Sequence, residues 1–177
     1  ITAHSGCVFA GLVDPRHDRG AQYRSMTEGT DTIDGVIIAT PTHLHAEQGS
    51  YAAQRGWDML IEKPVAGDLA QADGLAAAVS TAGVASLVGH HRRYHAPVQQ
   101  LKHLIANGSI GAPICANLIW AMRKPDSYFN DNWRTHGGSP VMINLVHDID
   151  LLRFCVGEIS DAVALRGANR RDGGRVE

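Results

Sequence analysis

The sequence has few cysteines, no long apolar run and little net charge. Its three cysteines, Cys7, Cys115 and Cys155, lie far apart without a Cys-x-x-Cys pair, which disfavours a zinc knuckle and a disulfide scaffold. The apolar runs, such as 36–39, are too short to span a bilayer. With 16 Lys and Arg against 18 Asp and Glu, the net charge of −2 gives no reason to expect a nucleic acid or an anionic membrane as partner.

The two ends of the chain have their own features. It begins at Ile1 rather than at a methionine, without a basic-then-apolar signal peptide, and it ends in a polar run, 170–175. We therefore expect a fragment of a longer, soluble protein of a reducing compartment such as the cytoplasm. Apolar residues make up 44% and charged residues 19% of the chain, which argues against intrinsic disorder.

In the first half of the chain, four short apolar segments alternate with longer amphipathic ones. This pattern is typical of βαβ units on a parallel sheet. The segment 8–13 is apolar throughout, as a strand covered on both faces should be, and it stops at Asp14-Pro15. The predicted strands are 8–13, 35–39, 59–61 and 84–88, and the predicted helices are 43–55 and 68–81.

The pattern changes after Tyr94, and we expect a domain boundary near His95 that separates residues 1–94 from residues 95–177. Apolar residues then recur first at helical period and later in alternation. The predicted elements are a helix from about Val98 to Asn107-Gly108, a strand at 114–122, a helix from Ser139-Pro140 to about Cys155, and a strand from Asp161. The fold class is therefore α/β.

Candidate ligand-binding residues follow the predicted strands, because loops and helix N-termini converge at the carboxyl edge of a parallel sheet. Asp14 suits a ribose hydroxyl, but an isolated Asp-Pro pair is more often a solvated turn. Lys63 leaves an apolar strand beside Glu62, where burial and charge can tune its pKa, and a surface ion pair is an equally open alternative. The strand ends are Asp14, Thr40-Pro41-Thr42, Glu62-Lys63-Pro64 and His90-His91.

A polar strip lies on the last predicted helix. Asn144, His147 and Asp148 are spaced by three and four residues and so share one face. Such a strip on an otherwise apolar helix must find partners or line a cavity. His147 can act as a general acid or base because its reference pKa is near neutrality, although a lone histidine is more often structural.

Six short motifs follow one another in a set order: Val-Asp-Pro (13–15), Ala-Thr-Pro-Thr-His-Leu-His (39–45), Glu-Lys-Pro (62–64), Arg-Arg-Tyr (92–94), Asn-Trp-Arg (132–134) and His-Asp-Ile-Asp (147–150). Each motif alone is weak, but their joint order is specific. From Val8 to about Ile159 the chain resembles the Gfo/Idh/MocA family of nicotinamide-dependent oxidoreductases, named for glucose-fructose oxidoreductase and inositol dehydrogenase. The resemblance favours functional roles for Lys63 and His147.

The resemblance implies a truncated Rossmann-type parallel sheet followed by part of an α/β domain. The resemblance implies that the second domain has an open, mostly antiparallel sheet. Because this sheet usually forms an oligomer interface in the family, the full-length parent is expected to be a homo-oligomer. The implied reaction is hydride transfer between NAD or NADP and a carbinol carbon of a sugar, inositol or related polyol. Because hydride departure leaves a carbonyl, a proton must leave the same oxygen.

The resemblance also implies residue roles. Lys63 matches the lysine that hydrogen-bonds the reacting oxygen, and His147 matches the histidine that exchanges a proton with it. Asp14 at the adenosine ribose favours NAD, although Arg16 leaves NADP open. The implied dinucleotide contacts are Asp14, Thr40, Pro41, His45, Glu62 and Lys63, the implied substrate contacts are Arg92, Trp133, Arg134, Asn144 and His147, and no metal is implied.

The sequence departs from the family pattern in three ways. Ile143 occupies the position where many members carry an aspartate, and the amide of Asn144 cannot accept a proton in its place. The Gly-x-Gly-x-x-Gly turn and the strand before it are absent. The stretch 14–33 is short for the expected helix and minor strand, and a gap is expected between the strands 8–13 and 35–39. We therefore expect weak NAD binding by these 177 residues.

Two other readings compete with a dehydrogenase. A metal-dependent hydrolase would use His43 and His45, with later histidines, as zinc ligands. Residues two apart face opposite ways on a helix, and the segment after His43 looks helical, which argues against a shared metal. A non-catalytic family member that binds a sugar or cofactor without turnover is the second reading, and Ile143 gives it some support.

Overall fold

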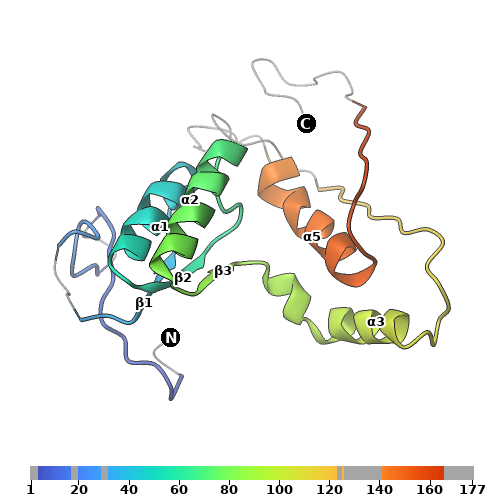
Figure 1. The fold of residues 1–177 in the computed structure, drawn as a ribbon, viewed down its shortest axis with the longest axis horizontal. Helices are drawn as coiled ribbons and strands as arrows, with labels where there is room; N and C mark the ends of the chain where they lie inside the picture. Colours follow the sequence, from blue (N-terminus) through green and yellow to red (C-terminus); the bar gives the residue numbers. More distant parts are fainter. Residues whose placement is uncertain (1–3, 17–19, 29–31, 123–124, 126–140, 166–177) are drawn as a thin grey trace.

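The computed structural model of the chain describes residues 4–16, 20–28, 32–122, 125 and 141–165 (Figure 1). Its elements run from a sheet with two helices to a largely helical second half. In chain order they are β1 (Gly35–Ile38), η2 (Thr42–Leu44), α1 (His45–Gln54), β2 (Asp58–Ile61), α2 (Leu69–Ala82), β3 (Ser86–Val88), η3 (His91–Tyr94), α3 (Ala96–Ala106), η5 (Val141–Leu145) and α5 (Val146–Cys155).

The three strands form one parallel sheet in the order β1-β2-β3. Ile37 is paired in register with Leu60, and Leu60 with Leu87. Each strand returns to the sheet through a helix, as parallel pairing requires. The structure therefore confirms the predicted βαβ arrangement and the strands at 35–39, 59–61 and 84–88.

Helices α1 and α2 lie side by side on one face of the sheet (Figure 1). Gly49 allows this packing, because a Cβ atom there would lie 2.7 Å from Leu75 Cδ1 and 3.1 Å from Ile61 Cδ1. The core between helices and strands consists of Ile38, Ala52, Ala53, Trp57, Met59, Ile61 and Leu75. The apolar side chains of the opposite face, Ile37, Leu60 and Leu87, remain exposed among the described residues.

The ends of α2 show why the sequence predicted it well. Asp68 Oδ1 accepts a hydrogen bond of 2.8 Å from the main-chain N–H of Gln71, which is an N-cap contact. The helix stops at Gly83, whose φ of 69° is a left-handed conformation that suits glycine. The predicted helix 43–55 is also confirmed, except that its first turn, η2, is 3-10 and α1 begins at His45.

The predicted strand at 8–13 is wrong. Val8 is 96% exposed. Among the described residues, this segment forms one isolated parallel bridge, between Val13 and Tyr23, and no strand. A strand needs a neighbour to which its main chain can hydrogen-bond. The segment 8–13 does not pair with the edge of β1, and its apolar side chains therefore remain exposed.

In the second half, the helices are confirmed and the strands are not. Helix α3 includes the predicted start at Val98, and Gly108 beyond its end has a φ of 74°. The predicted helix to Cys155 appears as the π-helical turn η5 followed by α5, while its expected start at Ser139-Pro140 lies outside the described residues.

No strand forms at 114–122 or in the described part of the segment that follows Asp161. Ile114 is fully exposed and Ile119 nearly so, because alternation of apolar residues supplies no hydrogen-bonding neighbour by itself. The expected open antiparallel sheet is therefore not formed by the described residues, and the boundary at 94/95 stays a prediction. Within the described part of the chain, none of the helices has the length and apolar character of a membrane span.

Candidate active site

The carboxyl ends of β1, β2 and β3 meet at one edge of the sheet. Main-chain hydrogen bonds continue past the strands there: Glu62 N–H donates to the carbonyl of Ile38 at 2.9 Å, and Gly89 N–H donates to that of Ile61 at 2.8 Å. A Cβ atom on Gly89 would lie 3.2 Å from the carboxyl carbon of Glu62. The loops that follow the strands are thus held close together.

His45 connects the loop after β1 with the loop after β2. Its side chain is 1% exposed, and its Nδ1 and Nε2 each lie 2.8 Å from a main-chain carbonyl oxygen, of Pro64 and of Thr40 respectively. Thr40 also donates from Oγ1 to Gln48 Oε1 at 2.6 Å. His45 therefore positions the main chain on both sides of the strand edge, with both ring nitrogens occupied inside the fold.

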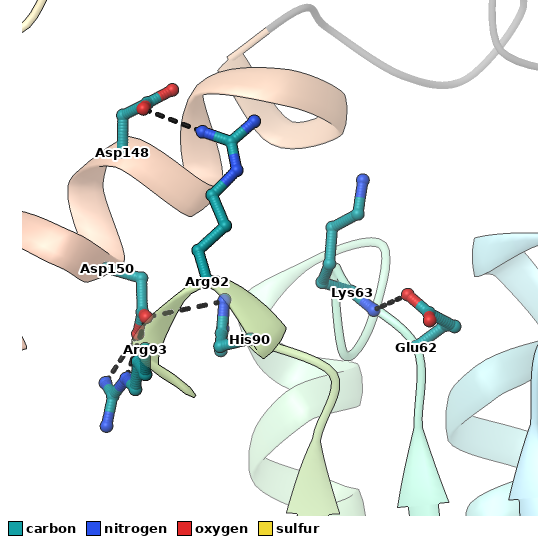
Figure 2. A network of polar contacts seen from close by, with 7 residues as sticks. All are labelled: Glu62, Lys63, His90, Arg92, Arg93, Asp148 and Asp150. Atoms are coloured by element: carbon teal, nitrogen blue, oxygen red, sulfur yellow. Dashed lines mark hydrogen bonds and ion pairs between the residues drawn. The ribbon is translucent and has the colours of Figure 1, made fainter. Parts of the chain in front are cut away.

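Lys63 projects from this edge. Its main-chain N–H donates to Glu62 Oε2 at 3.2 Å, and its side chain extends away from the Glu62 carboxylate (Figure 2). The Lys63 side chain is half-buried, and its charge lowers the pKa of both His90 and His147. The ammonium therefore acts on histidines from the end of β3 and from α5.

Helix α5 is held against the segment that follows β3 by two ion pairs (Figure 2). Arg92 Nη1 donates to Asp148 Oδ1 at 2.8 Å. Arg93 binds Asp150 through two hydrogen bonds, one of them from Nε to Oδ2 at 2.7 Å. His90 Nδ1 lies 3.8 Å from the same Asp150 oxygen. These contacts place α5 beside the strand edge.

His147 is buried at this contact, with 6% of its surface exposed. Its ring packs edge-on against His91, with 4.9 Å between centroids. Burial and, after it, the positive charge of Lys63 lower the pKa of His147 to about 4. Its Nδ1 is buried without a hydrogen-bond partner in the described structure. The ring is therefore neutral at pH 7 and able to accept a proton.

His90 is the second histidine of this contact with a lowered pKa. Burial lowers it, and this effect outweighs the opposite effect of the Asp150 carboxylate. The Nδ1 of His90 also lacks a hydrogen-bond partner among the residues that the structure describes. Lys63, His90 and His147 thus form a cluster in which the two imidazoles are neutral near pH 7 and Lys63 supplies a positive charge.

The predicted site residues separate into three groups. The strand-edge residues Thr40, Pro41, Glu62 and Lys63, together with Arg92 and His147, belong to the region just described, and Asn144 lies on η5, which leads into α5. Asp14 is not part of the three-stranded sheet, and its Oδ1 accepts from the Arg16 N–H at 2.9 Å. Trp133 and Arg134 lie outside the described residues. Sequence reasoning missed Arg93 and Asp150, although both stand inside motifs that it singled out.

The arrangement does not favour a metal-dependent hydrolase. His43 is exposed on η2, whereas both ring nitrogens of His45 contact main-chain oxygens. In the described ranges, no three His, Cys, Asp or Glu side chains gather as metal ligands. A nicotinamide dinucleotide fits the residues better, because the carboxyl edge of a parallel sheet here carries a lysine and a buried imidazole with an unpartnered nitrogen.

Comparison with known proteins identifies both parts of the chain. A model of an oxidoreductase family with an NAD-binding Rossmann fold matches residues 10–90. A model of the GFO/IDH/MocA C-terminal domain matches residues 98–177. The two matches cover nearly the whole sequence in the order that the family has.

Curated relatives include enzymes of sugars and inositols. The chain is 33% identical to a 1,5-anhydro-D-fructose reductase of Ensifer adhaerens over 91% of this chain and 53% of the relative. It is 30% identical to a scyllo-inositol 2-dehydrogenase (NAD(+)) of Bacillus subtilis (strain 168) over 76% of this chain and 39% of the relative. The chain thus spans about half or less of the length of these relatives.

Solved structures share the fold. The WlbA dehydrogenase of Bordetella pertussis, determined in complex with NADH and UDP-GlcNAcA, superposes with a TM-score of 0.71 at 26% identity. The match covers 82% of this chain and 46% of that one. With its parallel sheet, its strand-edge lysine and its two matched domains in order, the chain belongs to the Gfo/Idh/MocA family of NAD-binding oxidoreductases.

Proposed function

We propose that the chain carries the catalytic centre of a dehydrogenase that transfers a hydride between NAD(P) and a carbinol carbon of a sugar, inositol or related polyol. The observation that carries this proposal is that Lys63, at the end of β2, lies near enough to the buried His147 of α5 for its charge to add to the effect of burial in lowering the pKa of that imidazole. The names of the sugar and inositol relatives support the substrate class. We further propose that the whole protein acts as a homo-oligomer in the cytoplasm.

In this proposal Lys63 and His147 have different roles at the substrate oxygen. The ammonium of Lys63 donates a hydrogen bond to the hydroxyl oxygen, which favours its deprotonation. The neutral imidazole of His147, whose pKa is about 4, takes the proton from that hydroxyl. In the reverse direction the imidazolium returns the proton while Lys63 stabilises the developing negative charge. The nicotinamide, when bound, accepts or supplies the hydride.

The strand-edge loops supply the cofactor contacts in this proposal. Thr40, Pro41 and Glu62 line the dinucleotide, and His45 contributes by holding the loops in place. Asp14 at the adenosine ribose favours NAD over NADP. Arg16, whose Nε lies 3.6 Å from Asp14 Oδ1, leaves NADP open as the alternative.

The remaining predicted contacts concern the substrate. Arg92, Asn144, Trp133 and Arg134 bind hydroxyl groups or the ring of the polyol in this proposal. Because an amide cannot accept a proton, Asn144 binds rather than relays, and the proton transfer depends on Lys63 and His147.

The test follows the absorbance of reduced nicotinamide while the purified protein is mixed with a panel of sugars and inositols and with NAD or NADP in large excess, because weak NAD binding is expected. Turnover with at least one polyol is expected, and the variants Lys63→Met and His147→Gln are expected to lower kcat by roughly 10²–10⁴-fold. His43→Gln, on an exposed residue, is the matched control and should leave kcat unchanged. Binding of NADH without turnover on any polyol would instead support a non-catalytic family member.

A further inference from the structure

Two arginine–aspartate pairs join η3 to α5 (Figure 2), and they differ in the number of hydrogen bonds that they make. Arg92 and Asp148 share a single hydrogen bond of 2.8 Å. Arg93 donates to Asp150 from Nε at 2.7 Å and from Nη2 to the second oxygen, and Asp150 is only 6% exposed. Two parallel hydrogen bonds fix orientation as well as distance. The Arg93–Asp150 pair therefore constrains α5 more tightly.

Arg93 is itself held by neighbouring elements. Its guanidinium lies 5.0 Å from the ring centroid of Phe154 on α5, and Lys102 Nζ of α3 lies 3.6 Å from the same centroid. Gln99 Nε2 of α3 donates to the main-chain carbonyl of Arg93. The arginine thus connects η3, α3 and α5, and a buried carboxylate such as Asp150 depends on this partner.

The position of Asp150 determines that of His147. The two residues are three apart on α5, less than one helical turn. The charged and titratable groups that face His147 lie on the other side of the contact, namely Lys63, His90, His91 and Arg92. Arg93 and Asp150 are not among the charges with the largest effect on this pKa, so we assign their main influence on the imidazole to the placement of the helix.

We propose that Arg93 and Asp150 are positioning residues whose two-bond ion pair docks α5 so that the imidazole of His147 stands beside Lys63. The consequence for catalysis rests on the proposed function, whereas the docking is a property of the unliganded chain. Nicotinamide and polyol are therefore not needed to test it.

The test measures the pKa of His147 by NMR titration of its ring C–H groups in the unliganded chain. Arg93→Met removes the ion pair while keeping an apolar side chain over Phe154. The freed helix is expected to expose His147 and move it from Lys63, so the pKa of His147 rises from about 4 by roughly one unit or more. Asp150→Asn, which is isosteric, is expected to give a smaller rise.

The control variant is Glu158→Gln. Arg153 binds Glu158 through two hydrogen bonds of 2.8 and 3.1 Å, so this pair has the same chemistry, but both residues are exposed at the end of α5. Its removal should leave the pKa of His147 unchanged. Arg93→Lys keeps the positive charge but cannot make the two parallel hydrogen bonds of a guanidinium. If that geometry matters, the pKa of His147 is expected to rise by an intermediate amount. This mild variant also serves if Arg93→Met prevents folding.

The outcomes separate this inference from the proposed function. Lys63→Met should raise the pKa of His147 by removing a positive charge. If it does so while Arg93→Met, Arg93→Lys and Asp150→Asn leave that pKa unchanged, the positioning role is refuted and the lysine–histidine site stands. If Lys63→Met has no effect, the geometry behind the proposed function is refuted. In the active enzyme, Asp150→Asn should lower kcat by about tenfold or more without weakening NADH binding.

Discussion

The region from β1 to β3 and the region from α3 to α5 are stabilised by different contacts. The first buries an apolar core between the sheet and its helices, with Ile38, Ile61 and Leu75 at its centre. In the second, the residues buried among those described are polar, His147 and Asp150. Helix α5 is held by ion pairs and by cations on the Phe154 ring, and its apolar side chains, beside α3, are at most half-buried.

The apolar first region supports the loops at the strand edge, whereas the second region contributes buried polar side chains. Apolar burial is insensitive to pH, so it suits the sheet that holds the loops in place. Ionic contacts depend on protonation and on geometry, so the placement of α5 responds to conditions that leave the sheet intact. We expect mutation and acid to change the stability of one region without changing that of the other.

The largest effect is expected from Ile61→Ala, in the centre of the apolar core. Ile61 is fully buried, and its truncation should lower the free energy of unfolding by about 2–5 kcal/mol, because transfer and cavity costs add. Urea denaturation followed by circular dichroism measures the change. Leu87→Ala, on the exposed face of β3, is the control and should cost far less. Equal losses would contradict the assignment of the core to one face.

Acid should weaken the second region first. The pKa of His147 is about 4 in the folded chain, against 6.5 for the unperturbed side chain. Between these values the unfolded state binds a proton that the folded state does not, so stability falls as the pH drops from about 6.5 to 4. Hydrogen exchange of α5 amides should accelerate over this range before that of β2. His147→Gln should reduce the selective acceleration, and the remainder is expected from His90, whose pKa is also lowered.

Overpacking of the first region should have an intermediate effect. Gly49→Ala places a methyl group 2.7 Å from Leu75 Cδ1 and 3.1 Å from Ile61 Cδ1, so side chains or α1 must shift. A loss of about 1–3 kcal/mol in the free energy of unfolding is expected, measured in urea. Gly74→Ala on α2, where no atom lies within 4 Å of the new Cβ, is the matched control and should not destabilise the chain.

The smallest effect is expected from Glu158→Gln, at the exposed end of α5. Its ion pair with Arg153 is open to solvent, where such pairs contribute little. Thermal unfolding should give the midpoint of the unaltered chain. A loss as large as that of Gly49→Ala would show that exposed ion pairs, and not only Arg93–Asp150, hold the second region.

The sequence predicted the elements whose determinants are local. Helix α2 carries its own cap at Asp68 and its own stop at Gly83. The segments 8–13 and 114–122 were misread because an apolar pattern does not show whether a neighbouring strand exists. Ordered motifs predict roles for Lys63 and His147, whereas the Arg93–Asp150 pair, separated by 57 positions, leaves no local periodicity that reveals it.

The buried ring of His45 makes two loops mechanically dependent on each other. Its two ring nitrogens contact the carbonyl oxygen of Thr40, just after β1, and that of Pro64, just after β2. Displacement of either loop is therefore transmitted to the other through one rigid imidazole. In the proposed dehydrogenase, a ligand bound beside Thr40 would therefore also move the loop that carries Lys63. Cofactor binding at the end of β1 would in this way adjust the position of the Lys63 ammonium at the end of β2 before the substrate arrives.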